Sequence, residues 1–157
     1  MSDKFVLFWS GPFSQWYPSP FTIDGVKYNY AEQYMMAAKA LLFKDHSSRK
    51  KIMKTNSPRE QKALGRKVEN FDQGKWNSVA REVVFKGNMA KFSQNADLKK
   101  ELLSTGTKIL VEASPYDKVW GIGLAADDPN ALRPKNWRGK NWLGQVLMRV
   151  RAEISDE

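Results

Sequence analysis

Residues 30–43 carry the stretch YAEQYMMAAKALLF, and the fold class is read most directly from it. Strong helix formers dominate the stretch and neither glycine nor proline interrupts it, so it predicts an α-helix. Glu32 and Lys39 are seven residues apart and therefore lie on nearly the same helix face, roughly 10 Å apart along the axis. Met36 and Phe43 share that face, which a helix of a globular protein normally buries.

The face shared by Glu32 and Lys39 has two interpretations. A lysine that is partly buried in an apolar face loses solvation, so its pKa falls and its neutral amine can act as a nucleophile. Alternatively, both charges sit at the edge of the buried stripe and reach solvent, as long charged side chains commonly do. Helical spacing alone is compatible with either interpretation.

Short strands are predicted before this helix. The apolar run 5–9 is typical of a strand, and Asp24-Gly25 separates two alternating segments at 21–23 and 26–28. Because a type I′ turn needs a positive φ at both central residues, an Asp-Gly pair in this position predicts a β-hairpin.

More helices and one strand are predicted after it. The residues Ser57-Pro58-Arg59-Glu60 form a capping box with proline at the first helical position, which predicts a helix start. Helices are expected at 47–55, 58–67, 72–93, from a cap at Asp97 to Gly106, and at 141–154, with a buried strand at 109–111. Helices outnumber strands, and the strands are short and expected to be antiparallel. The sequence therefore predicts a predominantly α, α+β fold in a single domain over residues 1–157.

The composition excludes several classes of site. The 157 residues contain no cysteine and one histidine, His46. Disulfides, cysteine-ligated zinc, a thiol nucleophile and a multi-histidine metal site are therefore excluded. His46 lies in a polar, basic run and is expected to be an exposed surface residue. The chain has neither a signal-peptide pattern nor an apolar stretch long enough to span a membrane, so a cytoplasmic location is expected.

The net charge of +9 is concentrated in two blocks. Residues 44–67 carry nine Lys and Arg, and residues 133–151 carry six with no acidic residue. Trp137 and Trp142 are interleaved with the charges of the second block, and a cation beside a flat ring suits a nucleotide. Both blocks indicate phosphate-bearing partners, with a solvated helical face as the alternative.

Residues 112–123 form a second candidate site, where the predicted strand ends in a polar turn. Glu112 and Asp117 carry carboxylates at the end of the predicted strand, so both are candidates for general acid–base catalysis. Trp120 offers a stacking plane, and Gly121 lets backbone N–H groups approach a ligand. The alternative is that Asp117 only caps the turn and Trp120 only fills the core.

Residues 136–144 form a third candidate site. Asn141 is expected to cap the last helix, and Arg138 and Lys140 flank that helix N-terminus. A helix N-terminus beside two cations is a natural anion site. Plain capping followed by a surface loop is the alternative.

Several segments in this order resemble one family. They are GPFSQWYP at 11–18, AEQYMMAAKA at 31–40, KFSQN at 91–95, Thr105-Gly106, the run 112–123, NWLG at 141–144 and LMRVR at 147–151. Over nearly its whole length the chain resembles the NADAR family, also called YbiA-like proteins. The resemblance implies a compact, largely helical fold and N-glycosidase activity. The substrates it implies are ribosylated pyrimidine intermediates of riboflavin biosynthesis, or ADP-ribose attached to guanine in nucleic acid.

The resemblance also implies residue roles. Lys39 would attack the anomeric carbon of the ribose and form a Schiff base, while Glu32 and Asp117 would move protons. The substrate-binding residues it implies are Phe13, Ser14, Gln15, Trp16, Trp120, Gly121, Arg138 and Asn141. Gln15 is a departure, because the family often has Asn there, so the hydrogen bond made at this position would differ. No metal or cofactor is required.

A non-catalytic module that binds ADP-ribose or nucleic acid is the rival hypothesis, and a basic structural protein is a third. The expected partner is a ribosylated or ADP-ribosylated substrate, either a small molecule or linked to nucleic acid, with a possible nucleic-acid contact and no membrane. The oligomeric state does not follow from the sequence.

Overall fold

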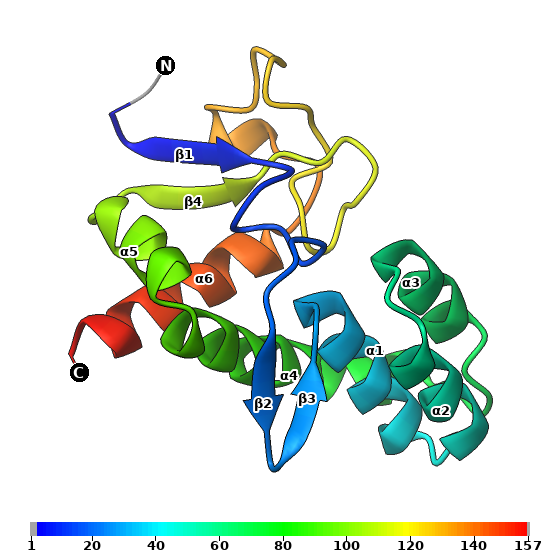
Figure 1. Ribbon diagram of the computed structural model, residues 1–157. Helices are drawn as coiled ribbons and strands as arrows, with labels where there is room; N and C mark the ends of the chain where they lie inside the picture. Colours follow the sequence, from blue (N-terminus) through cyan, green and yellow to red (C-terminus); the bar gives the residue numbers. More distant parts are fainter. Residues whose placement is uncertain (1–2, 157) are drawn as a thin grey trace. The chain divides into compact units, whose positions relative to one another are not determined.

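The computed structural model describes residues 3–156 and is dominated by helices (Figure 1). Its elements, in chain order, are β1 (Phe5–Phe8), β2 (Phe21–Ile23), β3 (Val26–Tyr28), α1 (Ala31–Leu42), α2 (His46–Lys54), α3 (Pro58–Arg66), α4 (Gln73–Gln94), α5 (Ala96–Ser104), β4 (Ile109–Glu112), the 3-10 helix η1 (Pro134–Asn136) and α6 (Trp142–Ser155). The predicted α+β class is confirmed. No helix within residues 3–156 is both long and apolar enough to cross a membrane.

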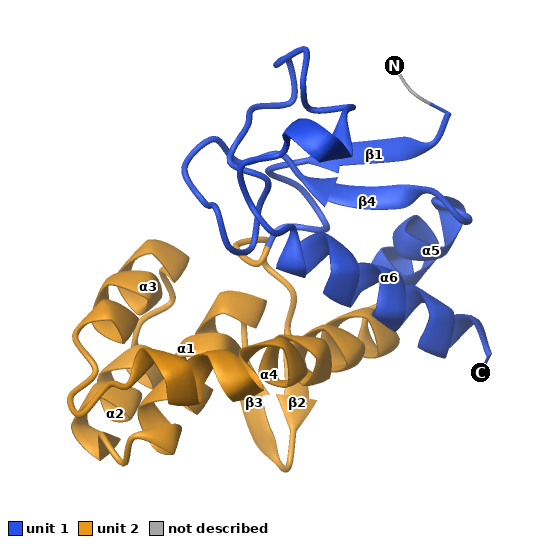
Figure 2. Ribbon diagram, turned by 180° about the vertical axis from the view of Figure 1, so that it is seen from behind, with its two compact units in different colours: residues 1–14, 97–157 blue, residues 15–96 orange. Residues whose placement is uncertain are grey.

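The chain forms two compact units (Figure 2). Unit 1 comprises residues 1–14 and 97–157, and unit 2 comprises residues 15–96. Unit 1 thus contains both ends of the chain, whereas unit 2 is one continuous segment with β2, β3 and α1 to α4.

Helix α1 is the centre of unit 2, where it packs against α2, α3 and α4. Gly87, in the middle of α4, is buried against α1, and a Cβ added there would lie 2.8 Å from Cδ2 of Tyr34. This close approach explains why α4 has a residue of low helix propensity in its interior. The predicted hairpin is confirmed, with φ of 51° at Asp24 and 79° at Gly25.

Unit 1 is built on a pair of parallel strands. β1 pairs with β4 in the register Phe5 with Ile109 through Phe8 with Glu112. The expectation that all strands are antiparallel is therefore correct for β2 and β3 but wrong for this pair. Parallel neighbours need a long connection, and here all of unit 2 lies between the two strands in sequence. Leu110 and Val111 are fully buried in β4, and α6 packs against this strand.

Two predicted helix caps are wrong. Helix α5 begins at Ala96, so Asp97 lies inside its first turn instead of capping it. Asn141 does occupy the residue before α6, but it has a left-handed backbone with φ of 55° and makes no capping bond. Its side-chain oxygen accepts from the backbone N–H of Glu112 at 3.0 Å, and its amide donates to the carbonyl of Leu110 at 3.0 Å. Asn141 therefore ties the start of α6 to β4.

Gly144 allows α6 to lie directly on β4, and we expect Gly144→Ala to destabilise the protein by about 3 kcal/mol. A Cβ at this position would overlap the carbonyl oxygen of Leu110 and the side chain of Asn141. Neither group can yield without breaking the bonds that join α6 to β4. Urea unfolding followed by circular dichroism measures the change.

Gly74→Ala is the matched control. Gly74 lies in the first turn of α4, where a Cβ would have no neighbouring atom closer than 4.0 Å, so alanine there should leave the stability unchanged or slightly higher. Equal unfolding midpoints for wild type and Gly144→Ala would contradict the close packing of α6 on β4.

Candidate active site

The first turn of α1 contains a buried carboxylate, that of Glu32, which is 7% exposed. Its backbone N–H donates to the carbonyl of Gln15 at 3.1 Å, which satisfies one of the amide groups left free at a helix start. The indole N–H of Trp16 donates to Glu32 Oε1 at 3.2 Å. The loop before the hairpin therefore holds the carboxylate through both backbone and side chain.

Lys39 lies two turns further along α1 and is half-buried. Burial lowers the pKa of the Lys39 amine, and the positive charge of Arg66 lowers it further, while the negative charge of Glu32 acts in the opposite direction. The interpretation in which both charges of this face reach solvent is wrong for Glu32, which is buried. Because its pKa is lowered, a larger share of the Lys39 amine is neutral at a given pH than in a solvated lysine. The neutral amine is the form that can act as a nucleophile.

An aromatic ring lies beside the Lys39 amine. Its Nζ lies 4.5 Å from the ring centroid of Phe71, and Phe71 packs edge-on against Phe43 at 5.3 Å. Phe71 and Trp16 are each 39% exposed, so both present ring surface to solvent. Exposed aromatic surface beside a weakly solvated amine suits a ligand with a flat base.

Gln15 supports the loop that carries Trp16. Its side-chain oxygen accepts from the amide of Asn88 on α4 at 2.9 Å, and its own amide approaches the sulfur of Met35 at 3.9 Å. Asn88 is fully buried and also donates to the carbonyl of Val84 at 2.8 Å. The longer glutamine thus reaches across to α4, and it positions the segment that carries Trp16.

The predicted residues at 117–121 belong to unit 1 and form a tight turn. Asp117 Oδ1 accepts from the backbone N–H groups of Val119 at 2.9 Å and Trp120 at 2.8 Å. Trp120 packs edge-on against Trp142 with centroids 5.5 Å apart. Gly121 is required by close packing, because a Cβ there would lie 2.8 Å from Glu112 Oε2. Asp117 therefore has the turn-capping role that the sequence left as an alternative.

The loop at 138–141 does not present the helix N-terminus that the sequence suggested as an anion site. The first amides of α6, those of Trp142 and Leu143, donate to the carbonyls of Val119 and Trp120 at 3.2 and 3.1 Å. Asn141 is 2% exposed and its side chain is held by β4. Arg138 is exposed, and its backbone N–H bonds to Ile122 at 2.9 Å. The suggested anion site therefore lacks the N–H groups of residues 142 and 143 as donors.

Phe13 and Ser14 lie in the segment of unit 1 that follows β1. Phe13 is 9% exposed and packs edge-on against Phe8 at 5.6 Å, so its ring contributes to the core of unit 1. The Ser14 N–H donates to the carbonyl of Gly11 at 2.9 Å and closes a turn. His46 is exposed, as expected. Within residues 3–156, no three His, Asp or Glu side chains gather closely enough to ligate a metal ion.

Sequence reasoning missed several charged residues. Lys91 on α4 is fully buried, and burial lowers its pKa to about 7. Its only signal in the sequence was its place in the KFSQN segment. Three further basic residues were counted only as part of the composition or not at all: Arg66, whose charge acts on Lys39, Lys62, which lies beside Trp16, and Lys75, which lies beside Phe43. Spacing within one helix could not reveal them, because they come from other helices.

The family model of the NADAR domain matches residues 7–155, which includes nearly all of both units. The chain belongs to the NADAR family. Among relatives, this NADAR protein is 47% identical to an N-glycosidase of Acanthamoeba polyphaga mimivirus, over 97% of each chain. It is 40% identical to Protein irg-1 of Caenorhabditis elegans, over 96% of this chain and 79% of the relative.

The solved structure of the Escherichia coli protein YbiA, determined by NMR, has the same fold. It aligns with a TM-score of 0.81 and 32% identity over 99% of this chain and 88% of YbiA. In sequence, YbiA of Escherichia coli strain K12 is named an N-glycosidase and is 32% identical over all of this chain and 92% of its own. The mimivirus relative and YbiA are both named N-glycosidases, which supports the same class of enzyme here.

Proposed function

We propose that this NADAR protein is an N-glycosidase that hydrolyses the bond between a ribose and a nucleobase. The substrate is either ADP-ribosylated guanine, free or in nucleic acid, or a ribosylaminopyrimidine phosphate. The observation that carries the proposal is the half-buried Lys39, whose pKa is lowered mainly by burial, on the same face of α1 as the buried Glu32. The names of the relatives support the bond type, and these two residues support a covalent route.

The proposed chemistry starts with the neutral Lys39 amine. Its lone pair bonds to the anomeric carbon as the carbon–nitrogen bond to the base breaks, and the departing nitrogen takes a proton. Opening of the sugar ring then gives a protonated Schiff base between Nζ and that carbon. Water adds to the carbon, the amine leaves, and the net reaction consumes one water molecule and releases base and sugar.

Glu32 is the proposed proton carrier at Lys39. It lies in the same unit, is buried, and its negative charge acts on the Lys39 amine. A carboxylate there accepts the proton that the attacking nitrogen must lose and returns it in the second half of the cycle. Trp16 and Phe71 are the proposed surfaces for the base. The roles of Asp117, Trp120 and Arg138 in substrate binding or proton transfer stay predictions, as does a cytoplasmic location.

A side-by-side turnover assay tests the proposal. The full chain is incubated with ADP-ribosylated guanosine and with a ribosylaminopyrimidine phosphate, and the released base is quantified by liquid chromatography with mass spectrometry. We expect base release from at least one, and a sugar adduct on the peptide containing Lys39 after borohydride reduction. Binding of ADP-ribose without release of either base would instead favour the non-catalytic module.

A further inference from the structure

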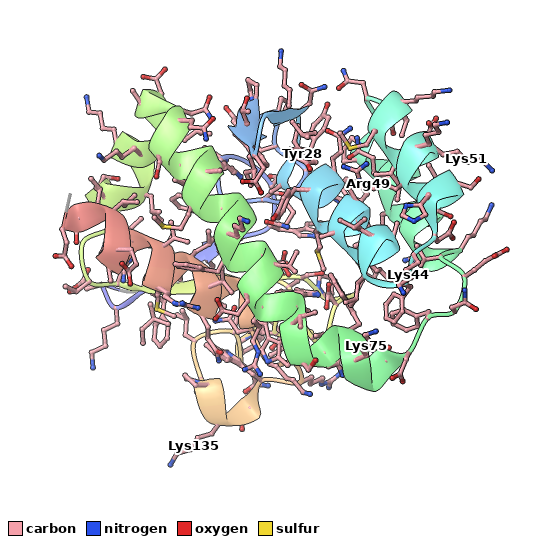
Figure 3. The ribbon with its side chains drawn as sticks, turned by 90° about the horizontal axis from the view of Figure 1, so that it is seen from below. Tyr28, Lys44, Arg49, Lys51, Lys75 and Lys135 are labelled. Atoms are coloured by element: carbon pink, nitrogen blue, oxygen red, sulfur yellow. The ribbon has the colours of Figure 1, made fainter. Side chains whose placement is uncertain are left out.

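Lys91 is a fully buried lysine of α4 that the chemistry described above does not use. Helix α4 packs against α1 and β2 of the same unit, and Figure 3 shows it lying alongside α1. Burial lowers the pKa of the Lys91 amine to about 7, and its Nζ lies 5.0 Å from the ring centroid of Phe92. An amine loses solvation when it is buried, whereas a methionine of similar length would fill the same space without that cost. The amine at this position therefore needs an explanation beyond packing.

Two asparagines, one in α4 and one at its C-terminal end, hold the segment 15–20, which we call the tryptophan loop. The Asn88 amide donates to Gln15 Oε1 at 2.9 Å, and the Asn95 amide donates to the carbonyl of Pro20 at 2.9 Å. Each amide also donates to the α4 carbonyl four residues earlier at 2.8 Å, which fixes its orientation. The tryptophan loop is therefore tied to α4 at its first and at its last residue.

Helical geometry places Lys91 between these two ties. Seen down the axis from position 88, position 95 is turned by roughly 20°, position 91 by roughly 60° and position 87 by roughly 100°, all to the same side. Gly87 is the point at which α4 meets Tyr34 of α1. The Lys91 side chain therefore leaves α4 between the direction of α1 and the direction of the tryptophan loop.

The contact between the tryptophan loop and α1 also holds the Glu32 carboxylate. The Trp16 indole donates to Glu32 Oε1 at 3.2 Å, and the Glu32 N–H donates to the carbonyl of Gln15 at 3.1 Å. The position of this carboxylate thus depends on how the loop is seated against α1 and α4. A change in the side chain at position 91 would shift the loop and, with it, the hydrogen bond to the carboxylate.

We propose that Lys91 is a positioning residue of the candidate active site, whose buried amine seats the tryptophan loop so that Trp16 holds Glu32 in place for proton transfer. This inference rests on the proposed function and adds a residue that acts through the loop and not on the substrate. An amine can donate hydrogen bonds to main-chain carbonyls, which a methionine side chain cannot do. The KFSQN segment at 91–95 thereby gains a role, because it supplies both this amine and Asn95.

Lys91→Met tests the proposal, since it keeps the length of the side chain and removes the amine. We expect the variant to melt at the wild-type temperature or above, because it no longer buries an amine. We also expect kcat for base release to fall about tenfold or more, because small displacements of catalytic groups cost factors of this size. If Lys91 only filled space, the variant would keep the wild-type kcat.

The hydrogen bond from Trp16 can be followed without turnover. Its indole N–H gives a resonance in nitrogen–proton correlation spectra, and Trp16→Phe assigns this resonance by its disappearance. We expect Lys91→Met to shift or broaden it. Lys86→Met is the matched control on the same helix and should leave it in place, because Lys86 is exposed and its ion pair with Asp24, 3.5 Å apart, is at the surface and contributes little.

Chemical rescue separates the amine from the packing of the side chain, and it also serves if Lys91→Met does not fold. The chain contains no cysteine, so Lys91→Cys introduces a single thiol. Unfolding in urea, alkylation with bromoethylamine and refolding convert this thiol into a lysine analogue with a sulfur in its side chain. We expect the alkylated protein to regain most of the wild-type kcat and the unalkylated one to stay as slow as Lys91→Met. The wild type, carried through the same steps, should be unchanged.

Either of two results with Lys91→Met would overturn the proposal: a wild-type kcat, or a Trp16 indole resonance at its wild-type position. Failure of the alkylated Lys91→Cys protein to regain activity would overturn the role of the amine. An absence of turnover in the wild type would refute the proposed function alone, because the shift of the indole resonance and the melting temperatures are measured without substrate.

Discussion

Lys39→Ala is expected to lower the rate of base release by at least about 1,000-fold, because it removes the nucleophile and a covalent route cannot proceed without one. The loss should appear in kcat, and the borohydride-trapped adduct should disappear completely. Single-turnover assays with mass spectrometry measure both. The physical reason is specific to this amine, since its half-buried position favours the neutral form that forms the bond.

Lys39→Arg is the companion variant. It keeps a positive charge and a long side chain over Phe71, but the guanidinium stays protonated and cannot attack. We expect it to be as inactive as Lys39→Ala while melting within a few degrees of the wild type. Activity within tenfold of the wild type in either variant would remove Lys39 from the mechanism.

The pH dependence of kcat/KM also tests the proposed role of the Lys39 amine. If the neutral form of Lys39 reacts, kcat/KM rises with pH until the pKa of Lys39 is passed, and this pKa lies below the ordinary lysine value. Arg66 lowers that pKa through its charge, so Arg66→Gln should raise it and move the rising limb of the profile to higher pH. A rising limb at the same pH as in the wild type would show that the charge of Arg66 does not control the pKa of Lys39.

Glu32→Gln is expected to reduce activity by about 100-fold or more, within the range found for loss of a general acid–base group. The substitution keeps the size of the side chain and an oxygen that can accept from the Trp16 indole, so the fold around α1 should persist. Steady-state kinetics at several pH values, together with thermal melting, measure the two effects separately.

The sign of the Glu32→Gln result discriminates between two roles for the carboxylate. Glu32 raises the pKa of Lys39 through its charge, so its neutral replacement lowers that pKa and leaves more of the amine uncharged. If Glu32 acted only by electrostatics, activity near neutral pH would therefore increase. A decrease requires the carboxylate itself to move a proton. Trp16→Phe, which keeps a ring but removes the 3.2 Å hydrogen bond, should cost less than Glu32→Gln.

Much of the local structure could be predicted because it depends on neighbours in sequence. The expected helix at 30–43 is α1 at Ala31–Leu42, and the capping box at Ser57 starts α3, with the Glu60 N–H donating to Ser57 Oγ at 3.2 Å. The hairpin follows from the need of its two turn residues for positive φ. The shared face of Glu32 and Lys39 follows from helical periodicity in the same way.

The errors concern groups whose partners are distant in sequence. Asn141 was expected to cap α6, but two backbone groups of β4, about 30 residues earlier, bind its side chain instead. The parallel pairing of β1 with β4 joins residues about 100 positions apart, and no local pattern encodes it. The N-terminus of α6 was one candidate anion site, but carbonyls of the turn at 117–121 accept from its first amides.

The sequence by itself determined the fold class and the placement of Glu32 and Lys39 on one helix face, since propensity, turn chemistry and periodicity act over a few residues. The family followed from the resemblance of several motifs spaced along the chain. Only the tertiary structure decided that Glu32 is buried, that Phe71 lies beside the Lys39 amine, and that Arg66 of α3 is close enough to lower the pKa of Lys39. Burial and electrostatic potential are sums over groups brought together by packing, and packing between helices cannot be read from the period of any one of them.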